Sequence, residues 1–205
     1  MKQNVAMHNV ERVVSQSTDS KSQKVCQAKQ DVWLKGVSRR PSPNFNHRPN
    51  ECDVDLLVIH NISLPPGQFG GDCIERFFTN CLDHSLHPFF KEIEGVEVSA
   101  HLLVRRDGSV VQFVPLNQRA WHAGRSVFQG RGECNDFSIG IELEGTDICP
   151  YTDEQYLALA RLTCDIQQLY PKITRDRITG HRDIAPGRKT DPGEAFDWDR
   201  YRSLL

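Results

Sequence analysis

The sequence predicts an α/β fold, a single domain in which helices flank a mixed β-sheet. Three observations predict this fold class. The apolar run VDLLVIH, residues 54–60, is typical of a buried strand, two β-rich runs flank a turn at Asp107-Gly108, and a long helical pattern begins after Thr152. The chain has 205 residues, which is enough for one domain with a proper core.

At the N-terminus we expect a flexible extension, residues 1–38, before a folded domain of residues 39–205. The extension is rich in Ser, Gln, Lys and Asp and has no sustained hydrophobic periodicity. Three prolines between residues 39 and 50 predict a chain that runs extended over the surface before the first strand.

The first strand ends in His60, whose side chain we expect to point into a cleft. After a loop with paired prolines and glycines, the apolar residues between Ile74 and Leu82 have the spacing of a short amphipathic helix that covers one face of the sheet. The next segment, which contains His84 and His87, is expected to be a loop with both histidines at the surface.

Residues 98–115 predict an antiparallel hairpin around Asp107-Gly108. In DFSIGIELEG, residues 136–145, apolar side chains alternate with small or acidic ones, the period of a half-buried strand, so Glu142 shares a face with small residues. Thr152 and Gln155 have capping-box spacing, and a long amphipathic helix is expected from there to Pro171.

The composition argues against several classes of partner. The chain has 25 basic and 27 acidic residues and a formal net charge of -2, so it lacks the excess of positive charge that is typical of nucleic-acid-binding proteins. No apolar run approaches the roughly 18 residues of a membrane span, and the N-terminus lacks the apolar region of a signal peptide. We therefore expect a cytoplasmic protein with no membrane partner. Seven cysteines at wide, irregular gaps predict neither a disulfide framework nor a C-x-x-C motif.

The segment GHRDIAPGRKTDPG, residues 180–193, places His181, Lys189 and Asp191 in one loop braced by proline and glycine. Together with His60, the two histidines and one carboxylate suit Zn²⁺ with a fourth position open for water, although the same donors would also suit Fe(II). There is no HExxH motif, and spacing alone leaves open that each histidine is an ordinary hydrogen-bonded residue. Of the other histidines, His101 is expected to be structural, as is His122 unless it contacts a metal ligand.

Two further side chains are candidates for catalysis. A carboxylate facing a partly dry cleft holds a proton more readily, so Glu142 could shuttle protons, and the alternative is an exposed glutamate on the solvent face of a sheet. Lys189 could stabilise an oxyanion beside a metal, or it could be a solvated cation of the loop.

Six segments, in order, resemble the type 2 N-acetylmuramoyl-L-alanine amidases, in particular their cytoplasmic members that act on 1,6-anhydro-muropeptides: VIHNISLPPGQFGGD, SAHLLVRRDGSVVQFVP, RAWHAGRS, CNDFSIGIELEGTD, PYTDEQY and ITGHRDIAPGRKTDPG. The resemblance covers the chain from about residue 40 to its C-terminus. It implies the type 2 amidase and peptidoglycan recognition fold. It also implies that zinc is bound by His60, His181 and Asp191, that Glu142 is the acid and base, and that Lys189 steadies the oxyanion.

The implied reaction is hydrolysis of the amide between the lactyl group of anhydro-N-acetylmuramic acid and L-alanine, during the recycling of cell-wall fragments. We expect the enzyme to be a monomer that takes small muropeptides, with Asn61, Trp121 and Arg131 in contact with the substrate. The resemblance also implies that loss of the enzyme would induce β-lactamase in some bacteria. Two other functions compete with this one: a lytic amidase acting on intact murein, which would require export, and a peptidoglycan-binding module without catalysis, whose members typically lack a metal ligand.

The chain departs from the family pattern at two acidic positions. Relatives often carry arginine where this chain has Glu97 and Glu133, and those arginines help to receive the acidic stem peptide. Reversed charges oppose the binding of an anionic peptide unless Arg125 or Arg131 compensates or the substrate peptide differs, so we expect a weakened preference for free peptide carboxylates.

Overall fold

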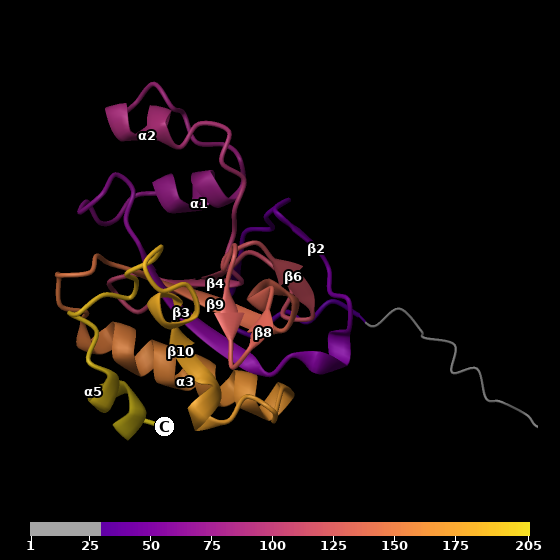
Figure 1. Cartoon of the computed structure of the whole chain (residues 1–205). Helices are drawn as coiled ribbons and strands as arrows, with labels where there is room; N and C mark the ends of the chain where they lie inside the picture. Colours follow the sequence, from indigo (N-terminus) through magenta and orange to yellow (C-terminus); the bar gives the residue numbers. More distant parts are fainter. Residues whose placement is uncertain (1–29) are drawn as a thin grey trace, which may run out of the picture. The chain divides into compact units, whose positions relative to one another are not determined.

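Six strands form the central sheet of the computed structural model, which describes residues 30–205 (Figure 1). Their order across the sheet is β1, β5, β4, β9, β3, β10, with bounds Ser38–Arg39, Val110–Gln112, Leu102–Val104, Ser138–Glu144, Leu56–Ile62 and Ile178–Gly180. The pair β4 and β5 is antiparallel and every other pair is parallel, so the predicted hairpin and the predicted mixed sheet are both confirmed. Two smaller pairs flank the sheet: β2 (Phe45–His47) with β6 (Gln118–Ala120), and β7 (Val127–Phe128) with β8 (Arg131–Gly132).

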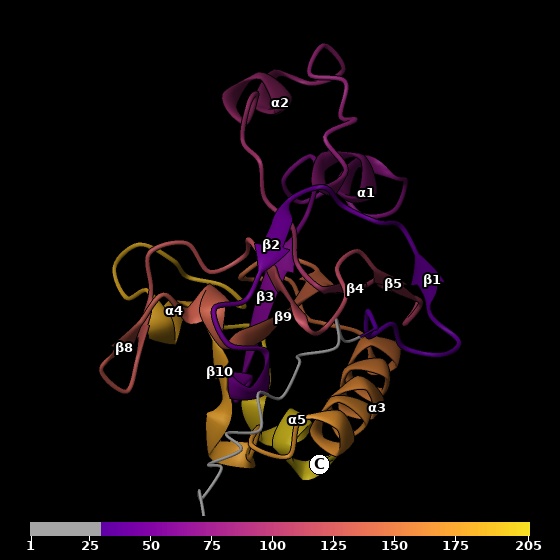
Figure 2. The same cartoon turned by 90° about the vertical axis from the view of Figure 1, so that its right-hand side faces the viewer.

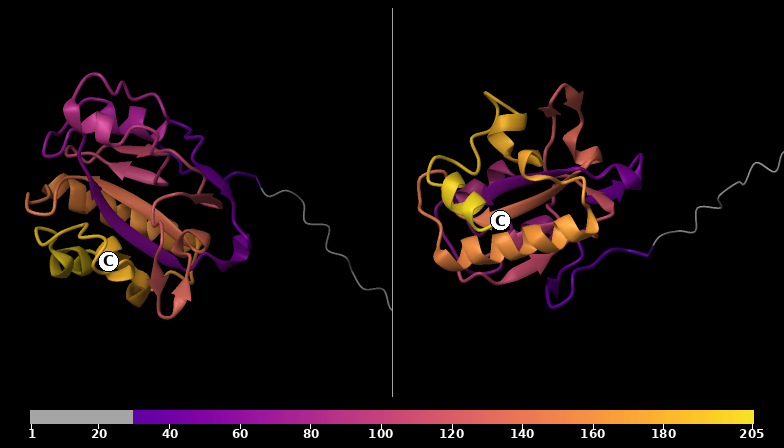
Figure 3. Two further views of the ribbon diagram at one scale, coloured as in Figure 1. Left: turned by 45° about the horizontal axis from the view of Figure 1, so that its top comes forward. Right: turned by 90° about the horizontal axis from the view of Figure 1, so that it is seen from below.

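One face of the sheet packs against the long helix α3, Asp153–Leu169, and the C-terminal helix α5, Trp198–Ser203 (Figure 3). The capping box predicted for Thr152 and Gln155 is present, with the N–H of Gln155 donating to Thr152 Oγ1 and the N–H of Thr152 donating to Gln155 Oε1. Alternate residues of β3 and β9, such as Ile59 and Ile141, belong to the same buried cluster as Leu159 of α3. This side of the molecule is structural core.

The opposite face carries two short helices, α1, Cys73–Phe78, and α4, His181–Ile184, and a third, α2, Pro88–Glu92, lies on the side of α1 away from the sheet (Figure 2). Phe77 and Phe78 of α1 and Phe90 of α2 form a second buried cluster with Leu103 of β4, so α1 covers part of the sheet as predicted. Helix α1 ends at Phe78, earlier than expected, and Leu82 lies beyond it. A third cluster forms beside α4 and contains Leu56, Val58, Ala123, Cys134, Phe137 and Ile184.

His84 and His87 lie in a loop, as predicted, and are partly exposed. Helix α2 begins directly after them, because the side chain of His87 caps the helix N-terminus by accepting from the N–H of Phe89, at 3.2 Å, and Pro88 occupies the first turn. Two other expectations are wrong. Strand β9 is buried along its whole length rather than half-buried, because elements cover both faces of the sheet. The proline-rich segment before β3 is not wholly at the surface either, since Ser42, Asn44 and Arg48 are buried.

Residues 31–38 also pack on this domain, where Leu34 is buried and its N–H donates to Gln112 Oε1 at 2.8 Å. We therefore propose a domain boundary near residue 31 rather than at residue 39. The remainder of the predicted extension, residues 1–29, lies outside the described residues. Three 3-10 helices, Glu51–Asp53, Cys134–Asp136 and Arg175–Arg177, complete the elements. Within residues 30–205 no helix combines the length and the apolar character needed to cross a membrane.

Candidate active site

Strand order brings distant residues together on the face of the sheet opposite α3. Strand β9 lies beside β3 in parallel register, and His60 is paired with Glu142. Strand β10 lies on the other side of β3, with Gly180 paired with Ile59, so that His181 emerges next to His60. Residues paired across neighbouring strands share a face of the sheet. His60 and Glu142 therefore lie on one face, close to His181 at the end of β10.

Three side chains offer ligand atoms that converge on one point. His60 Nδ1 lies 3.0 Å from His181 Nδ1 and 2.9 Å from Asp191 Oδ2, and His181 Nδ1 lies 3.0 Å from the same oxygen. All three residues are buried. Two ring nitrogens and a carboxylate oxygen at these separations fit one ion with bonds of about 2.0–2.2 Å, so this group is a candidate metal site as the sequence predicted.

The protonation states also suit a metal. Burial lowers the pKa of His60 to about 4, even though the hydrogen bond with Asp191 opposes the shift. Burial alone would raise the pKa of Asp191, but hydrogen bonds with His181 and His60 outweigh it and hold the pKa well below its usual range. At neutral pH the site therefore presents a neutral imidazole at His60 and an ionised carboxylate, the forms that bind cations.

The outer nitrogens of both histidines have partners. His60 Nε2 lies 2.9 Å from Nδ1 of His122, and His181 Nε2 lies 3.0 Å from the carbonyl oxygen of Ala123. Of the two interpretations that the sequence left open for His122, the structure places it against a candidate metal ligand. His101 is structural as predicted, since its Nδ1 accepts from the N–H of Gly140 at 3.0 Å and its Nε2 lies 3.0 Å from the carbonyl oxygen of Gln118.

The loop that carries Asp191 is held by neighbouring backbone. The N–H of Arg182, in α4, donates to the carbonyl oxygen of Asp191 at 2.9 Å, and Tyr151 Oη donates to the carbonyl oxygen of Pro192 at 2.7 Å. Gly193 has φ of +83°, and a Cβ there would overlap the backbone of Asp147. The glycine is therefore required because the loop at Gly193 lies directly against the backbone at Asp147, where no side chain would fit.

A cavity of about 240 Å³ opens beside these ligands. It is lined by Asn61, Ile62, Phe77, Phe78, Val96, Val98, Ser99, Trp121, His122, Glu142, His181, Lys189 and Asp191. Glu142 is buried, and its Oε2 has no hydrogen-bond partner among the described residues. Burial and the nearby charge of Asp191 raise the pKa of Glu142 well above its usual range, while Lys189 opposes the shift. The cavity therefore joins the candidate metal ligands to an unpartnered carboxyl and a cation.

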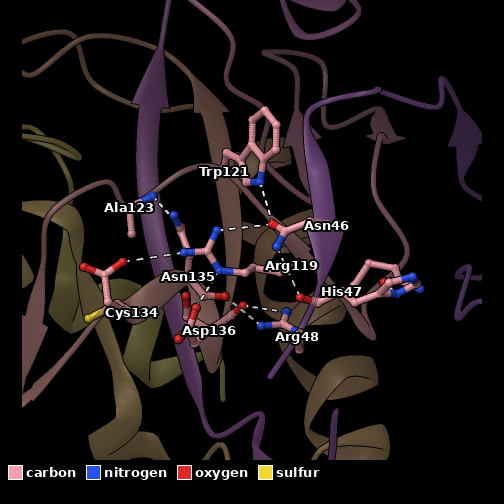
Figure 4. A network of polar contacts seen from close by, with 12 residues as sticks. Asn46, His47, Arg48, Arg119, Trp121, Ala123, Cys134, Asn135 and Asp136 are labelled. Atoms are coloured by element: carbon pink, nitrogen blue, oxygen red, sulfur yellow. Dashed lines mark hydrogen bonds and ion pairs between the residues drawn. The ribbon is translucent and has the colours of Figure 1, made fainter. Parts of the chain in front are cut away.

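The three residues expected to contact substrate have different positions. Asn61 and Trp121 line the cavity, and Asn61 Nδ2 donates to Asp147 Oδ1 at 2.8 Å. Trp121 Nε1 donates to Asn46 Oδ1 at 2.7 Å, as Figure 4 shows. Arg131 lies outside this lining, in β8. Its guanidinium donates to Asp53 at 2.6 Å and stacks on a phenylalanine ring.

The two acidic departures lie at the surface. Glu97 is exposed and lines a second cavity of about 180 Å³, which shares Phe77 and Val96 with the first. Glu133 is exposed, and its Oε2 lies 3.6 Å from a guanidinium nitrogen of Arg119.

Sequence reasoning missed a buried polar network behind the site, drawn in Figure 4. Arg48 donates from Nη1 to the carbonyl oxygen of Asn135 at 2.9 Å and from Nη2 to that of Ser138 at 2.7 Å, and burial lowers its pKa to about 10. Asn135 Oδ1 in turn accepts from the N–H groups of His122 and Ala123. The only signal in the sequence is an arginine in a proline-rich segment, which by itself indicates an exposed residue.

Comparison with known proteins finds close relatives. A family model described as N-acetylmuramoyl-L-alanine amidase matches residues 50–194. The 1,6-anhydro-N-acetylmuramyl-L-alanine amidase AmpD of Escherichia coli K12 is 58% identical over 173 residues, which cover 84% of this chain and 94% of the relative. The crystal structure of a selenomethionine derivative of AmpD matches with a TM-score of 0.82 and 55% identity, over 84% of this chain and 96% of that one. A structure of AmpDh3 from Pseudomonas aeruginosa in complex with an anhydromuramic pentapeptide matches with a TM-score of 0.56 and 28% identity, over 76% and 61%.

Proposed function

The chain belongs to the N-acetylmuramoyl-L-alanine amidase family, and we propose that it cleaves the amide between the lactyl group of 1,6-anhydro-N-acetylmuramic acid and L-alanine, using zinc. It is an amidase of muropeptides, related over most of its length to AmpD. The observation that carries the mechanism is the convergence of His60, His181 and Asp191 beside a cavity lined by Glu142, whose Oε2 has no hydrogen-bond partner among the described residues. We place the reaction in the cytoplasm, in cell-wall recycling, with small muropeptides as substrates of a monomer.

Zinc is the metal we propose because two imidazole nitrogens and one carboxylate oxygen are a common catalytic donor set for that ion. When bound, zinc supplies a Lewis acid for the lactyl carbonyl and lowers the pKa of its water to about 7. His60 and His181 would hold this ion through Nδ1, since their Nε2 atoms face protein partners. Metal analysis distinguishes zinc from Fe(II), which the same donors could bind.

Glu142 moves the proton in this proposal. Its buried carboxyl lies in the same cavity as the ligands and makes no hydrogen bond from Oε2 within the described residues, so that atom is available to a substrate or a water. A raised pKa makes the group a base that readily returns its proton. It takes the proton of the attacking water and delivers it to the departing L-alanine nitrogen, without which the C–N bond does not break.

Lys189 and the cavity walls complete the proposed roles. Lys189 lines the cavity and places a positive charge where the carbonyl oxygen becomes negative in the tetrahedral intermediate. Trp121 offers an aromatic face to the sugar, and Asn61 offers a carboxamide held by Asp147. Arg131 has its guanidinium engaged with Asp53, and we assign it no role in positioning the substrate.

The test is hydrolysis of anhydro-N-acetylmuramoyl-tripeptide followed by mass spectrometry. The protein is assayed as purified, after chelation, and after zinc is added back, with intact murein as a second substrate. We expect anhydro-N-acetylmuramic acid and free tripeptide as products, loss of activity with the chelator, and recovery with zinc. Folded, zinc-loaded protein that leaves the lactyl amide intact would reject the proposal and favour a binding module, and faster cleavage of intact murein would favour a lytic enzyme.

A further inference from the structure

One short segment, Trp121–Ala123, contacts the outer nitrogen of both candidate histidine ligands. The carbonyl oxygen of Ala123 lies 3.0 Å from His181 Nε2. A carbonyl oxygen can only accept a hydrogen bond, so His181 donates to it from Nε2, and Nδ1 is the nitrogen directed at the other candidate ligands. With an ion bound, this arrangement leaves the lone pair of Nδ1 for the metal.

The partner of His60 is a second imidazole, which can either donate or accept. His122 Nδ1 lies 2.9 Å from His60 Nε2, and His122 Nε2 lies 3.2 Å from Ser138 Oγ. The ring lies directly over Gly140, where a Cβ would come within 2.5 Å of Nδ1. If His60 donates from Nε2, neutral His122 accepts at Nδ1 and donates from Nε2 to the serine hydroxyl. If instead His122 donates from Nδ1 to Nε2 of a neutral His60, the proton of His60 is on Nδ1, and that nitrogen has no lone pair for a metal.

A single amide oxygen holds this segment in place. Asn135 Oδ1 accepts from the N–H of His122 at 3.2 Å and from the N–H of Ala123 at 2.8 Å (Figure 4). The buried guanidinium of Arg48 fixes the backbone on both sides, since it donates to the carbonyl oxygens of Asn135 and Ser138. Asn135 thus positions the imidazole that faces one ligand and the carbonyl that faces the other.

We propose that Asn135 and His122 are positioning residues that keep Nε2 of both histidines against protein partners, so that each Nδ1 is directed at the ion. Mutating a residue that hydrogen-bonds the outer nitrogen of a metal-bound histidine generally lowers the metal affinity about 10–100-fold. The inference rests on the proposed metal site and adds how the protein prepares it. The inference concerns metal binding and not catalysis. It can therefore fail while the amidase activity is confirmed, and it can hold if the amidase activity is absent.

The first test needs no substitution. Long-range ¹H–¹⁵N spectra of the zinc-loaded, full-length protein report which nitrogen of each imidazole carries the proton. We expect Nε2–H at His60, His181 and His122. Zinc-loaded protein in which His60 or His181 carries its proton on Nδ1, or in which His122 does, would overturn the proposal.

The second test measures the affinity for zinc alone by competition with a chelating indicator. Asn135→Ala and His122→Phe are expected to weaken zinc binding about 10–100-fold, whereas Asn135→Asp and His122→Asn, which keep an acceptor near the same position, recover most of it. The matched control is Asn117→Ala, another buried asparagine whose amide oxygen accepts a backbone N–H, that of Val32, at 2.9 Å. Variants at Asn135 and His122 that lose stability like the control but keep wild-type zinc affinity would show a merely structural role.

Discussion

Replacing Glu142 by glutamine is expected to lower activity and raise stability together, a combination that few substitutions produce. The change keeps the shape of the side chain and removes its ability to ionise. A general acid and base contributes about 10²–10⁴-fold to catalysis, so kcat should fall within that range while KM changes little. A residue that served only the structure would show no such loss at unchanged fold.

The stability change follows from the burial of Glu142. Its Oε2 lacks a partner among the described residues, and leaving a buried group without one costs about 1–3 kcal/mol, and more when the group is charged, as the ionised carboxylate is and the carboxamide of glutamine is not. The pKa of Glu142 is raised in the folded state, so the native metal-free protein binds the proton more tightly than the unfolded chain does. Its favourable contribution is complete below the unfolded pKa of about 4.3 and is lost as the pH rises through the folded pKa.

The assay compares wild type and Glu142→Gln, both metal-free, by urea unfolding from about pH 4 to about pH 9, beside kinetics of the zinc-loaded forms. We expect the variant to be the more stable at the high end, by about 1–3 kcal/mol, and the difference to vanish near pH 4. Glu144→Gln is the matched control, because Glu144 is also buried in β9 but accepts from the N–H groups of Gly70 and Arg106. The reasoning fails if Glu142→Gln is destabilised as this control is, or if it keeps more than about a tenth of the wild-type kcat.

Three further predictions concern the walls of the site. Lys189→Met should lower kcat about 10²–10³-fold with the fold intact, and a loss confined to KM in steady-state kinetics would remove its oxyanion role. Gly193→Ala should destabilise the protein by more than Gly187→Ala, because both have positive φ but only Gly193 meets neighbouring backbone, and equal unfolding free energies would contradict this. With Glu97 and Glu133 exposed at the surface, kcat/KM should differ little between tripeptide and truncated substrates, and a strong preference for the full acidic peptide would refute that expectation.

Local patterns in the sequence were enough to predict several elements. The Asp107-Gly108 turn fixed the hairpin of β4 and β5, and Thr152 with Gln155 fixed the start of α3. These signals work because the interactions that stabilise each element join residues close in sequence. The apolar run before His60 likewise predicted a buried strand, although β3 continues past His60 to Ile62.

The remaining features depend on contacts between distant segments. Spacing could not establish that His60 and His181, separated by 121 residues, place Nδ1 atoms 3.0 Å apart, because that follows from β10 lying beside β3. The burial of Arg48 has the same origin, since its acceptors belong to residues far along the chain. The alternation in β9 predicted one exposed face, whereas the covering of both faces is set by helices elsewhere in the sequence.

The most direct test of the central claim is a titration of metal-free protein with zinc, in which hydrolysis of anhydro-N-acetylmuramoyl-tripeptide is followed together with bound metal. If His60, His181 and Asp191 form one catalytic metal site, activity should rise linearly to one equivalent and then remain constant. Asp191→Ala should then bind zinc far more weakly and stay inactive at that ratio. Full activity of rigorously metal-free protein, or an Asp191→Ala variant with wild-type zinc affinity, would contradict the account.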